Sequence, residues 1–225
     1  MLTEKLHHRL LALSTPLIAD ARCVLGLEES HLDSGIRPVI PFTRMAGSAI
    51  TVQIEFAVDE DSADLNLMRQ AFVDPPQAYP IIAMALPPKL HAYGSFGSGS
   101  ATLARSQGFV GALIEGAVRD TPDLKEMQYP VFCRALSPGY LVGKASTGAV
   151  GTPVRVGGRE IRQGDVIVAD HDGVIINRRC ELEAILDQAE KVQAWEKDLH
   201  KAYREGQNPA DAEAPRSAPL TDPPA

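Results

Sequence analysis

Apolar residues at helical spacing, together with helix-start signals such as Thr-Pro, predict a series of helices along the chain. These expected helices lie at residues 3–13, at 15–25, from Leu65 to Phe72, from Ser100 to Gln107, from Thr121 onward, and at 180–205. The last one is long, and its apolar positions follow a single seam, which is typical of a helix that packs along its whole length.

Alternating or continuous apolar runs bounded by glycine and proline predict strands between the helices. These runs are residues 50–56, 81–86, 110–115, 131–134, 154–156, 159–161, 166–169 and 174–176. Gly157-Gly158 indicates a tight hairpin between two of them. Residues 27–37 are expected to form a loop, and residues 135–153 carry no clear pattern. The order of helices and strands indicates an α/β domain with a mixed sheet.

Length and composition are those of a globular domain followed by a tail. The chain has 225 residues, of which 44% are hydrophobic and 23% charged. A chain of this size can bury a sizeable core without disulfides. We expect residues 1–206 to form a single domain. Residues 207–225 are rich in alanine, proline and aspartate, a composition typical of a disordered tail.

The charge balance and the cysteines narrow the class of protein. Lysine and arginine number 22 against 29 aspartate and glutamate, for a net charge of −7. Nucleic-acid binders usually carry a basic stripe, so no nucleic-acid partner is expected. No apolar run reaches the ~20 residues of a membrane span, so no membrane association is expected. The three cysteines are widely spaced and form no CxxC motif, which is typical of reduced thiols in a cytoplasmic protein.

The first candidate site is a glycine- and serine-rich loop at residues 94–100, followed by a helix. Glycine lets a ligand approach the backbone closely, and the start of a helix offers free N–H groups to a carboxylate or phosphate. The loop lacks the Gly-Lys-Ser/Thr of a Walker loop and the third glycine of a Rossmann fingerprint. A flexible turn without a ligand is the alternative interpretation.

The second candidate is the pair Arg119-Asp120, which closes the apolar strand that begins at residue 110. Sites in α/β sheets gather at the carboxyl ends of strands. Arginine has a planar fork that matches a carboxylate, and aspartate offers oxygen to a hard divalent cation. The alternative is a surface ion pair in which Asp120 caps the helix beginning at Thr121.

The third candidate is Glu196, a carboxylate within the apolar seam of the last helix. The seam consists of Leu182, Ile185, Ala189, Val192, Glu196, Leu199 and Tyr203. A buried carboxylate is unfavourable unless it is paired or functional, so this seam could pack against a polar site of a neighbouring subunit. A solvated helix end is the alternative. Lys144 is the best candidate for a Schiff-base lysine, with a structural or carbonyl-binding cation as the alternative.

Several stretches of sequence together carry a resemblance to a known family. They lie within residues 13–21, 35–38, 46–52, 108–120 and 164–174, and the strongest is 108–120, which ends in Gly-Ala-Val-Arg-Asp. These motifs resemble the RraA-like family. That family includes the class II 4-hydroxy-4-methyl-2-oxoglutarate / 4-carboxy-4-hydroxy-2-oxoadipate aldolases and proteins that regulate a ribonuclease. The resemblance covers roughly residues 10–200.

The resemblance implies a swivelling β/β/α domain with a mixed sheet, N-terminal helices and a long C-terminal helix. It also implies a homotrimer or homohexamer with sites between subunits. Arg119 would bind a substrate carboxylate, and Asp120 would hold Mg²⁺ or Mn²⁺. Glu196 would reach the site from a neighbouring subunit. The pyruvyl part of the substrate would be held by backbone amides of Gly97, Ser98, Gly99 and Ser100.

One departure from the family bears on these implied roles. The family loop usually reads Trp-Gly followed by Glu, Asp or Asn and then Leu, whereas residues 96–99 read Phe-Gly-Ser-Gly. The acidic or amide side chain of the family is thereby replaced by the hydroxyl of Ser98.

The implied roles predict a divalent-metal-dependent lyase acting on a small 2-oxo acid. The reaction would be a retro-aldol cleavage of the 4-hydroxy-4-methyl-2-oxoglutarate type, oxaloacetate decarboxylation, or both, through a pyruvate enolate. The alternative is a non-catalytic binding protein of the ribonuclease-regulator type.

Overall fold

A computed structural model describes residues 1–59 and 61–207, and its framework is a nine-stranded mixed sheet. The strands of this sheet are β1 (Arg37–Pro38), β2 (Met45–Phe56), β3 (Pro80–Ala85), β4 (Gly94–Phe96), β5 (Gly111–Val118), β6 (Val131–Leu136), β7 (Ala145–Val150), β10 (Val166–Ala169) and β11 (Val174–Asn177). The main path is β1-β6-β5-β3-β2-β10-β11, with β4 paired to β5 and β7 paired to β2. A separate hairpin consists of β8 (Val154–Val156) and β9 (Arg159–Ile161).

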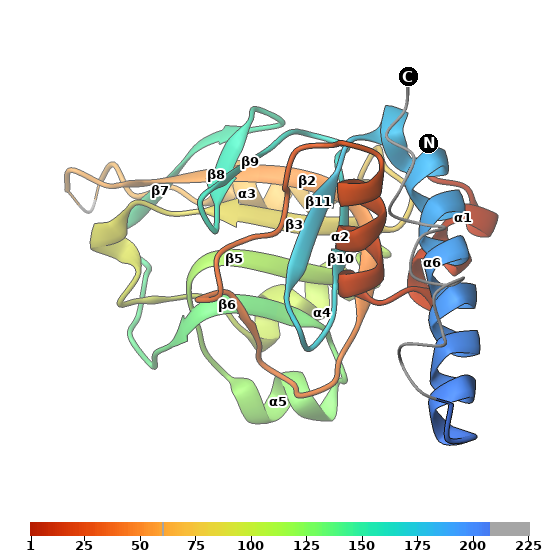
Figure 1. The fold of residues 1–225 in the computed structure, drawn as a ribbon. Coiled ribbons are helices and arrows are strands. Elements are labelled where there is room, and N and C mark those ends of the chain that lie inside the picture. Colours follow the sequence, from red (N-terminus) through yellow and green to blue (C-terminus); the bar gives the residue numbers. More distant parts are fainter. Residues whose placement is uncertain (60, 208–225) are drawn as a thin grey trace.

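The helices cover the sheet in two groups. They are α1 (Glu4–Ala12), α2 (Thr15–Val24), α3 (Asn66–Ala71), α4 (Ser98–Ser106), α5 (Thr121–Glu126) and α6 (Leu182–Arg204), with short 3-10 turns η1 (Pro88–Leu90) and η2 (Arg179–Glu181). The N-terminal helices α1 and α2 lie beside the long α6 along one side of the molecule, at the right of Figure 1. There they pack on β10 and β11 in one apolar cluster. The sequence therefore predicted the mixed sheet, the N-terminal helices and the long C-terminal helix correctly.

The four central strands β2, β3, β5 and β6 run parallel to one another. Parallel strands need crossover connections, and α4 and α5 supply two of them. Strand β3 is buried on both faces, as expected for a central parallel strand. Its alternate residues separate two clusters: Ile82 and Met84 pack towards α3, α4 and α5, whereas Ile81 and Ala83 pack towards the β8–β9 hairpin.

One expected strand begins earlier than predicted, and another strand lies in a segment for which no element was predicted. Strand β2 begins at Met45 rather than at residue 50, because its first half reads Met-Ala-Gly-Ser-Ala and is buried between β3 and β10. Residues 135–153 contain β7, whose small and polar side chains form no apolar run but whose backbone pairs antiparallel with the outer half of β2. The loop expected at 27–37 ends in the two-residue β1.

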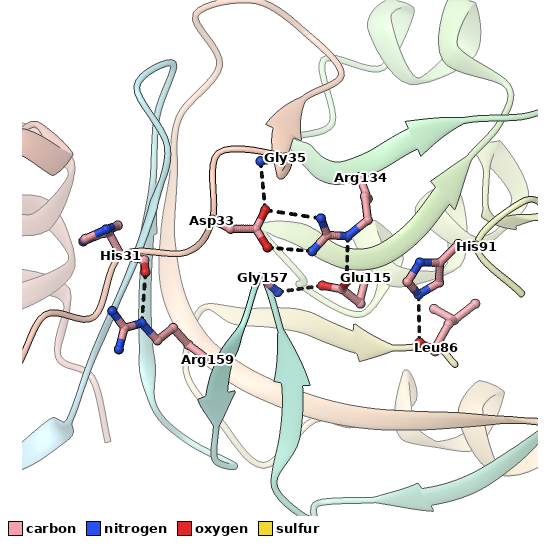
Figure 2. A network of polar contacts seen from close by, with 9 residues as sticks. All are labelled: His31, Asp33, Gly35, Leu86, His91, Glu115, Arg134, Gly157 and Arg159. Atoms are coloured by element: carbon pink, nitrogen blue, oxygen red, sulfur yellow. Dashed lines mark hydrogen bonds and ion pairs between the residues drawn. The ribbon is translucent and has the colours of Figure 1, made fainter. Parts of the chain in front are cut away.

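A network of ion pairs and hydrogen bonds attaches the hairpin to the sheet (Figure 2). Glu115 of β5 accepts hydrogen bonds at 2.6 Å from Arg134 Nε of β6 and at 2.6 Å from the backbone N–H of Gly157. Arg134 also pairs with Asp33, 2.8 Å from Nη2 to Oδ2. Gly157 lies in the hairpin turn at φ +53°, where a Cβ would meet Leu32 at 2.6 Å. The turn therefore requires glycine, and Glu115 holds it in place.

The remaining expectations concern membranes, cysteines and the tail. Among the described residues, no helix combines the length and apolar character needed to cross a membrane. Cys133 is buried, and burial raises the pKa of its thiol to about 11, so it is not a reactive thiolate at neutral pH. Cys23 and Cys180 are exposed free thiols. The tail expected at 207–225 lies outside the described residues except for its first position.

Candidate functional site

The pair Arg119-Asp120 lies where the sequence predicted it, directly after the last residue of β5. Strand β4 pairs with this end of β5, and the N–H of Arg119 donates to the carbonyl of Phe96 at 2.9 Å. This pairing places the start of α4 beside Arg119 and Asp120. The two leading candidate segments, separated by about twenty residues of chain, therefore form one site.

The carboxylate of Asp120 is fixed by α4 and not by the helix that follows it. Its Oδ2 accepts hydrogen bonds from the backbone N–H of Ser98 at 3.1 Å and from the Ser98 hydroxyl at 3.2 Å. Asp120 occupies the N-cap position of α5, as the alternative interpretation expected, but its side chain makes no capping hydrogen bond there. The backbone of Asp120 is left-handed, at φ 56°, a conformation that aspartate tolerates better than most residues and that often marks functional positions.

The segment expected as a glycine-serine loop is more ordered than predicted. Residues 94–96 form β4, and α4 begins at Ser98 immediately after Gly97. A Cβ at Gly97 would lie 2.4 Å from Asp120 Oδ2, so glycine is required for the close approach. Because Asp120 occupies the amide of Ser98, the free amides at this helix start are those of Gly99 and Ser100 in the described structure. Of the four amides predicted to hold an anion, that of Ser98 is thus already bonded to Asp120, and anion binding by the others stays a prediction.

The guanidinium of Arg119 is held between Asp120 and an aromatic ring. Its Nε lies 3.6 Å from Asp120 Oδ2, and its Cζ lies 5.5 Å from the centroid of the Tyr140 ring. Gly94 lies behind the arginine, where a Cβ would meet the Cβ of Arg119 at 2.9 Å. The side chain of Arg119 is 37% exposed, so the cation is positioned by the protein and remains open to a ligand.

These groups line a cavity of about 320 Å³. Sequence reasoning identified its polar part, which comprises Gly97, Gly99, Ser100, Arg119 and Asp120. It missed the contribution of α3, which provides Met68 and Arg69, and that of the loop between β6 and β7, which provides Tyr140 and Val142. Apolar residues that line a cavity have the same sequence pattern as core residues, so no signal in the pattern distinguished them.

The structure does not bring Glu196 or Lys144 to this cavity. Glu196 lies half-buried on α6, which packs with α1 and α2 on the other side of the molecule from the carboxyl ends of the central strands (Figure 1). Its expected approach from a neighbouring subunit stays a prediction. Lys144 is exposed, with its Nζ 5.5 Å from the ring centroid of Tyr93, and it does not line the cavity. A structural role therefore describes Lys144 better than a Schiff base.

The donor atoms of the site are compatible with a hard divalent cation. Residues 1–59 and 61–207 contain no cluster of three or more His, Cys, Asp or Glu that could form a complete protein cage. Asp120 nevertheless presents a second carboxylate oxygen, Oδ1, which has no hydrogen-bond partner in the described part of the chain, and the side chain is 34% exposed. Mg²⁺ commonly binds through one or two carboxylates and completes its shell with water and substrate. Asp120 would hold it, and Ser98 would orient the carboxylate.

Comparison with known proteins identifies the family to which the chain belongs. Residues 15–176 match the RraA-like family, described as Aldolase/RraA. That match spans most of the chain and includes both Ser98 and the Arg119-Asp120 pair, so the protein belongs to the RraA-like family.

Individual relatives agree with this assignment. The chain is 32% identical over 173 residues to a protein of Halalkalibacterium halodurans named "Putative 4-hydroxy-4-methyl-2-oxoglutarate aldolase", covering 77% of this chain and 78% of the relative. The crystal structure of Streptomyces coelicolor RraAS2, described as an unusual member of the RNase ES inhibitor RraA protein family, shares 24% identity. It superposes with a TM-score of 0.75 over 88% of this chain and 96% of that one. A structure from a study of cellulases of gut-associated microbes superposes with a TM-score of 0.79 at 22% identity over 88% of each chain. At these identities the two structures show the shared fold alone.

Proposed function

We propose that this protein is a divalent-metal-dependent lyase that cleaves the bond between C3 and C4 of a small 2-oxo acid. One observation carries the proposal: the cavity combines an open guanidinium, two free helix-start amides and an oriented carboxylate within one polar region. The first two suit the carboxylate of a 2-oxo acid. The third suits Mg²⁺ or Mn²⁺. The aldolase name of the Halalkalibacterium relative supports the same chemistry.

The residues of the chain bind and orient the substrate. Arg119 donates to the C1 carboxylate, and the amides of Gly99 and Ser100 hold the same end of the molecule. Tyr140 limits the movement of the guanidinium, so the carboxylate meets a preorganised partner. Mg²⁺ or Mn²⁺ bound at Asp120 supplies a Lewis acid for the 2-oxo group.

In the aldol cleavage, the C4 hydroxyl loses its proton and C4 becomes a carbonyl carbon. The electron pair of the C3–C4 bond moves to C3 and forms a pyruvate enolate. Return of one proton to C3 gives pyruvate, so the atoms of the substrate divide between pyruvate and one carbonyl compound. Oxaloacetate would react similarly, because loss of carbon dioxide from C4 leaves the same enolate. The positively charged groups of the site stabilise the negative charge that develops on the enolate in this step.

We further propose that the active form is a homotrimer or homohexamer. In that assembly Glu196 from α6 of a neighbouring copy approaches the cavity and accepts the C4 hydroxyl proton. The half-buried position of Glu196, in a seam that otherwise consists mainly of apolar residues, supports a contact outside its own subunit.

The direct test is pyruvate release from oxaloacetate, followed by coupled NADH oxidation with and without Mg²⁺ or Mn²⁺. We expect metal-dependent release, and a fall in kcat of about a hundredfold or more in Asp120→Ala and in Arg119→Ala. Asp123→Ala provides the matched control, because Asp123 is an exposed carboxylate in the first turn of α5 and does not line the cavity. Unchanged kcat in either site variant would contradict the proposal.

A second candidate function is regulation of a ribonuclease by direct binding. The description of the Streptomyces neighbour as a member of an RNase inhibitor family favours it. The shortened side chain at Ser98, in place of the family's acidic or amide group, would fit a site that has lost catalysis. A correctly folded protein that releases no pyruvate with any divalent metal, and that inhibits RNA cleavage by a ribonuclease of the same cell, would establish this function instead.

A further inference from the structure

The cavity at Arg119 has two chemically different halves. The polar half contains the groups expected to hold the 2-oxo carboxylate and the metal ion. The other half is an apolar wall, which we define as Leu65, Met68, Phe72, Leu103, Leu141 and Val142. The polar half would bind the 2-oxo carboxylate end of a ligand. The apolar wall therefore indicates the chemical nature of the other end.

One part of the apolar wall comes from α3 and the two residues that flank it, Leu65 and Phe72. Helix α3 is attached to the sheet through β7: the N–H of Thr147 donates to the carbonyl of Asp64 at 2.7 Å, and the N–H of Met68 donates to the Thr147 hydroxyl at 3.2 Å. Met68 and Phe72 belong to the main core cluster. This side of the cavity is therefore formed before a ligand binds.

A second part of the apolar wall, Leu141 and Val142, comes from the loop between β6 and β7. The N–H of Gly94 donates to the carbonyl of Gly139 at 2.9 Å, and the Ser137 hydroxyl donates to the carbonyl of Ala92 at 2.6 Å. These bonds hold the loop against β4. The guanidinium of Arg119 lies over the Tyr140 ring, and Val142, two residues further on, lines the cavity and is 49% exposed. The same loop therefore contacts Arg119, which would bind the carboxylate, and contributes Val142 to the apolar wall.

Charge at the apolar half is limited to one side chain. Of the described residues that line the cavity, only Arg69 is charged besides Arg119 and Asp120. Arg69 is exposed, and its Nη1 lies 3.4 Å from Asn66 Oδ1. An exposed cation in water binds a second carboxylate weakly, whereas an apolar group placed against the preformed wall leaves water.

We propose that the substrate of this site is a 4-hydroxy-2-oxo acid whose C4 carries an apolar alkyl or aryl group, and that the apolar wall binds this group. The inference rests on the proposed lyase function and specifies its substrate. Cleavage of the C3–C4 bond converts the C4 hydroxyl into an aldehyde and releases pyruvate, with the hydroxyl proton balanced by the proton added at C3. The products are pyruvate and an apolar aldehyde.

The experiment compares three substrates on the full-length protein with Mn²⁺. They are 4-hydroxy-2-oxo-4-phenylbutanoate, which has an apolar C4 group, 4-hydroxy-4-methyl-2-oxoglutarate, which has a second carboxylate, and oxaloacetate, which tests the enolate chemistry alone. We expect kcat/KM for the phenyl substrate to exceed that for the oxoglutarate by about tenfold or more, which is the discrimination that an apolar pocket can provide.

Two variants connect the preference to the apolar wall. Val142→Ser should lower the ratio of kcat/KM for the phenyl substrate to that for oxaloacetate by about fivefold. Val58→Ser makes the same change at a residue that is 90% exposed and away from the cavity, and it should leave the ratio unchanged. If the protein prefers 4-hydroxy-4-methyl-2-oxoglutarate and Arg69→Ala removes that preference, Arg69 binds a second carboxylate. That result would overturn the inference, whereas the proposed lyase function would stand. Loss of all pyruvate release, including that from oxaloacetate, would overturn both.

Discussion

At the scale of single residues, the site depends on the absence of a side chain at Gly97. A Cβ there would lie 2.4 Å from Asp120 Oδ2 and 3.0 Å from Cγ of Arg119. We expect Gly97→Ala to displace the carboxylate and to lower Mn²⁺ affinity by at least about tenfold, as loss of an orienting contact commonly does at metal sites. Titration of the Mn²⁺ electron paramagnetic resonance signal measures this affinity.

Gly99 provides the matched control for that substitution. It lies in the same helical turn, but a Cβ at Gly99 meets no atom within 4 Å. Gly99→Ala should therefore bind Mn²⁺ as the unchanged protein does. Equal loss of affinity in the two variants would show that alanine perturbs the turn in general, and would contradict a specific contact between residue 97 and Asp120.

Residue-scale reasoning found the polar half of the site because its chemistry is visible in the residue types. Arg119 and Asp120 are charged side chains at the end of an apolar strand, and such positions stand out in the sequence. Their contact with Ser98 depends on the pairing of β4 with β5, which is a tertiary event. Tyr140 lies in a segment without periodicity, so nothing in the chain indicated that its ring would contact Arg119.

At the scale of elements, the ion-pair network of Figure 2 connects β5, β6 and the hairpin turn through Glu115. The Glu115 side chain is 13% exposed, and its loss would leave both Arg134 Nε and the Gly157 N–H without this partner. We expect Glu115→Ala to lower the free energy of unfolding by at least about 2 kcal/mol, measured by urea denaturation.

A surface pair serves as the comparison for Glu115. Glu160 accepts a hydrogen bond from Arg162 Nε at 2.7 Å, almost the same length, but both side chains are at least half exposed. Exposed pairs contribute little to stability. Glu160→Ala should therefore change the urea midpoint only slightly. A similar loss of stability in Glu115→Ala and Glu160→Ala would contradict a larger contribution from the buried contacts of Glu115.

Helix α1 carries a pH-dependent contact with the sheet. The ring of His7 stacks on Tyr79 with centroids 3.7 Å apart, and its Nε2 lies 3.1 Å from the carbonyl oxygen of Ala46. Burial lowers the pKa of His7 below its ordinary value of 6.5, and the charge of neighbouring His8 acts in the same direction. The unfolded chain therefore binds a proton more readily, so the free energy of unfolding should fall as the pH decreases through this range.

Urea denaturation at about pH 7.5 and about pH 5.5 measures this dependence. His7→Gln should reduce the difference between the two pH values, because the group that gains the proton on unfolding is gone. His8→Gln changes the adjacent exposed imidazole and should keep most of the difference. An undiminished pH dependence in His7→Gln would show that other groups produce it.

Helices and strands were predicted correctly from the sequence where the pattern of apolar side chains is strong. They were missed where backbone pairing with a neighbouring strand determines the structure. The apolar run of β5 and the seam of α6 were recognised from their spacing. Strand β7 and the first half of β2 were missed, because small and polar residues form strands only when neighbouring strands supply the hydrogen bonds. The helix start at Ser98 was placed too late, since glycine and serine are weak helix formers.

At the scale of the whole molecule, α6 lies on the other side of the chain from the carboxyl end of β5 (Figure 1). The cavity is lined by Arg119 and Asp120, which directly follow that end of β5. Helix α6 buries its seam only as far as Val192, and Glu196 follows one turn later. A closed assembly of identical subunits can bring these two surfaces together around a rotation axis. The proposed shared site then requires Arg119 and Asp120 from one copy and Glu196 from the next.

Mixed assemblies test this arrangement directly. Glu196→Ala and Asp120→Ala should each be inactive in the cleavage of a 4-hydroxy-2-oxo acid, in which Glu196 accepts the C4 hydroxyl proton. Coexpression in equal amounts should restore about a quarter of the unchanged activity, since random neighbours pair two intact half-sites with that frequency. Arg119→Ala coexpressed with Asp120→Ala should restore nothing, because both residues belong to the same half-site. Size-exclusion chromatography checks that each mixture assembles. Full activity of Glu196→Ala alone, or assembled mixtures without restored activity, would show that Glu196 does not complete a neighbour's cavity.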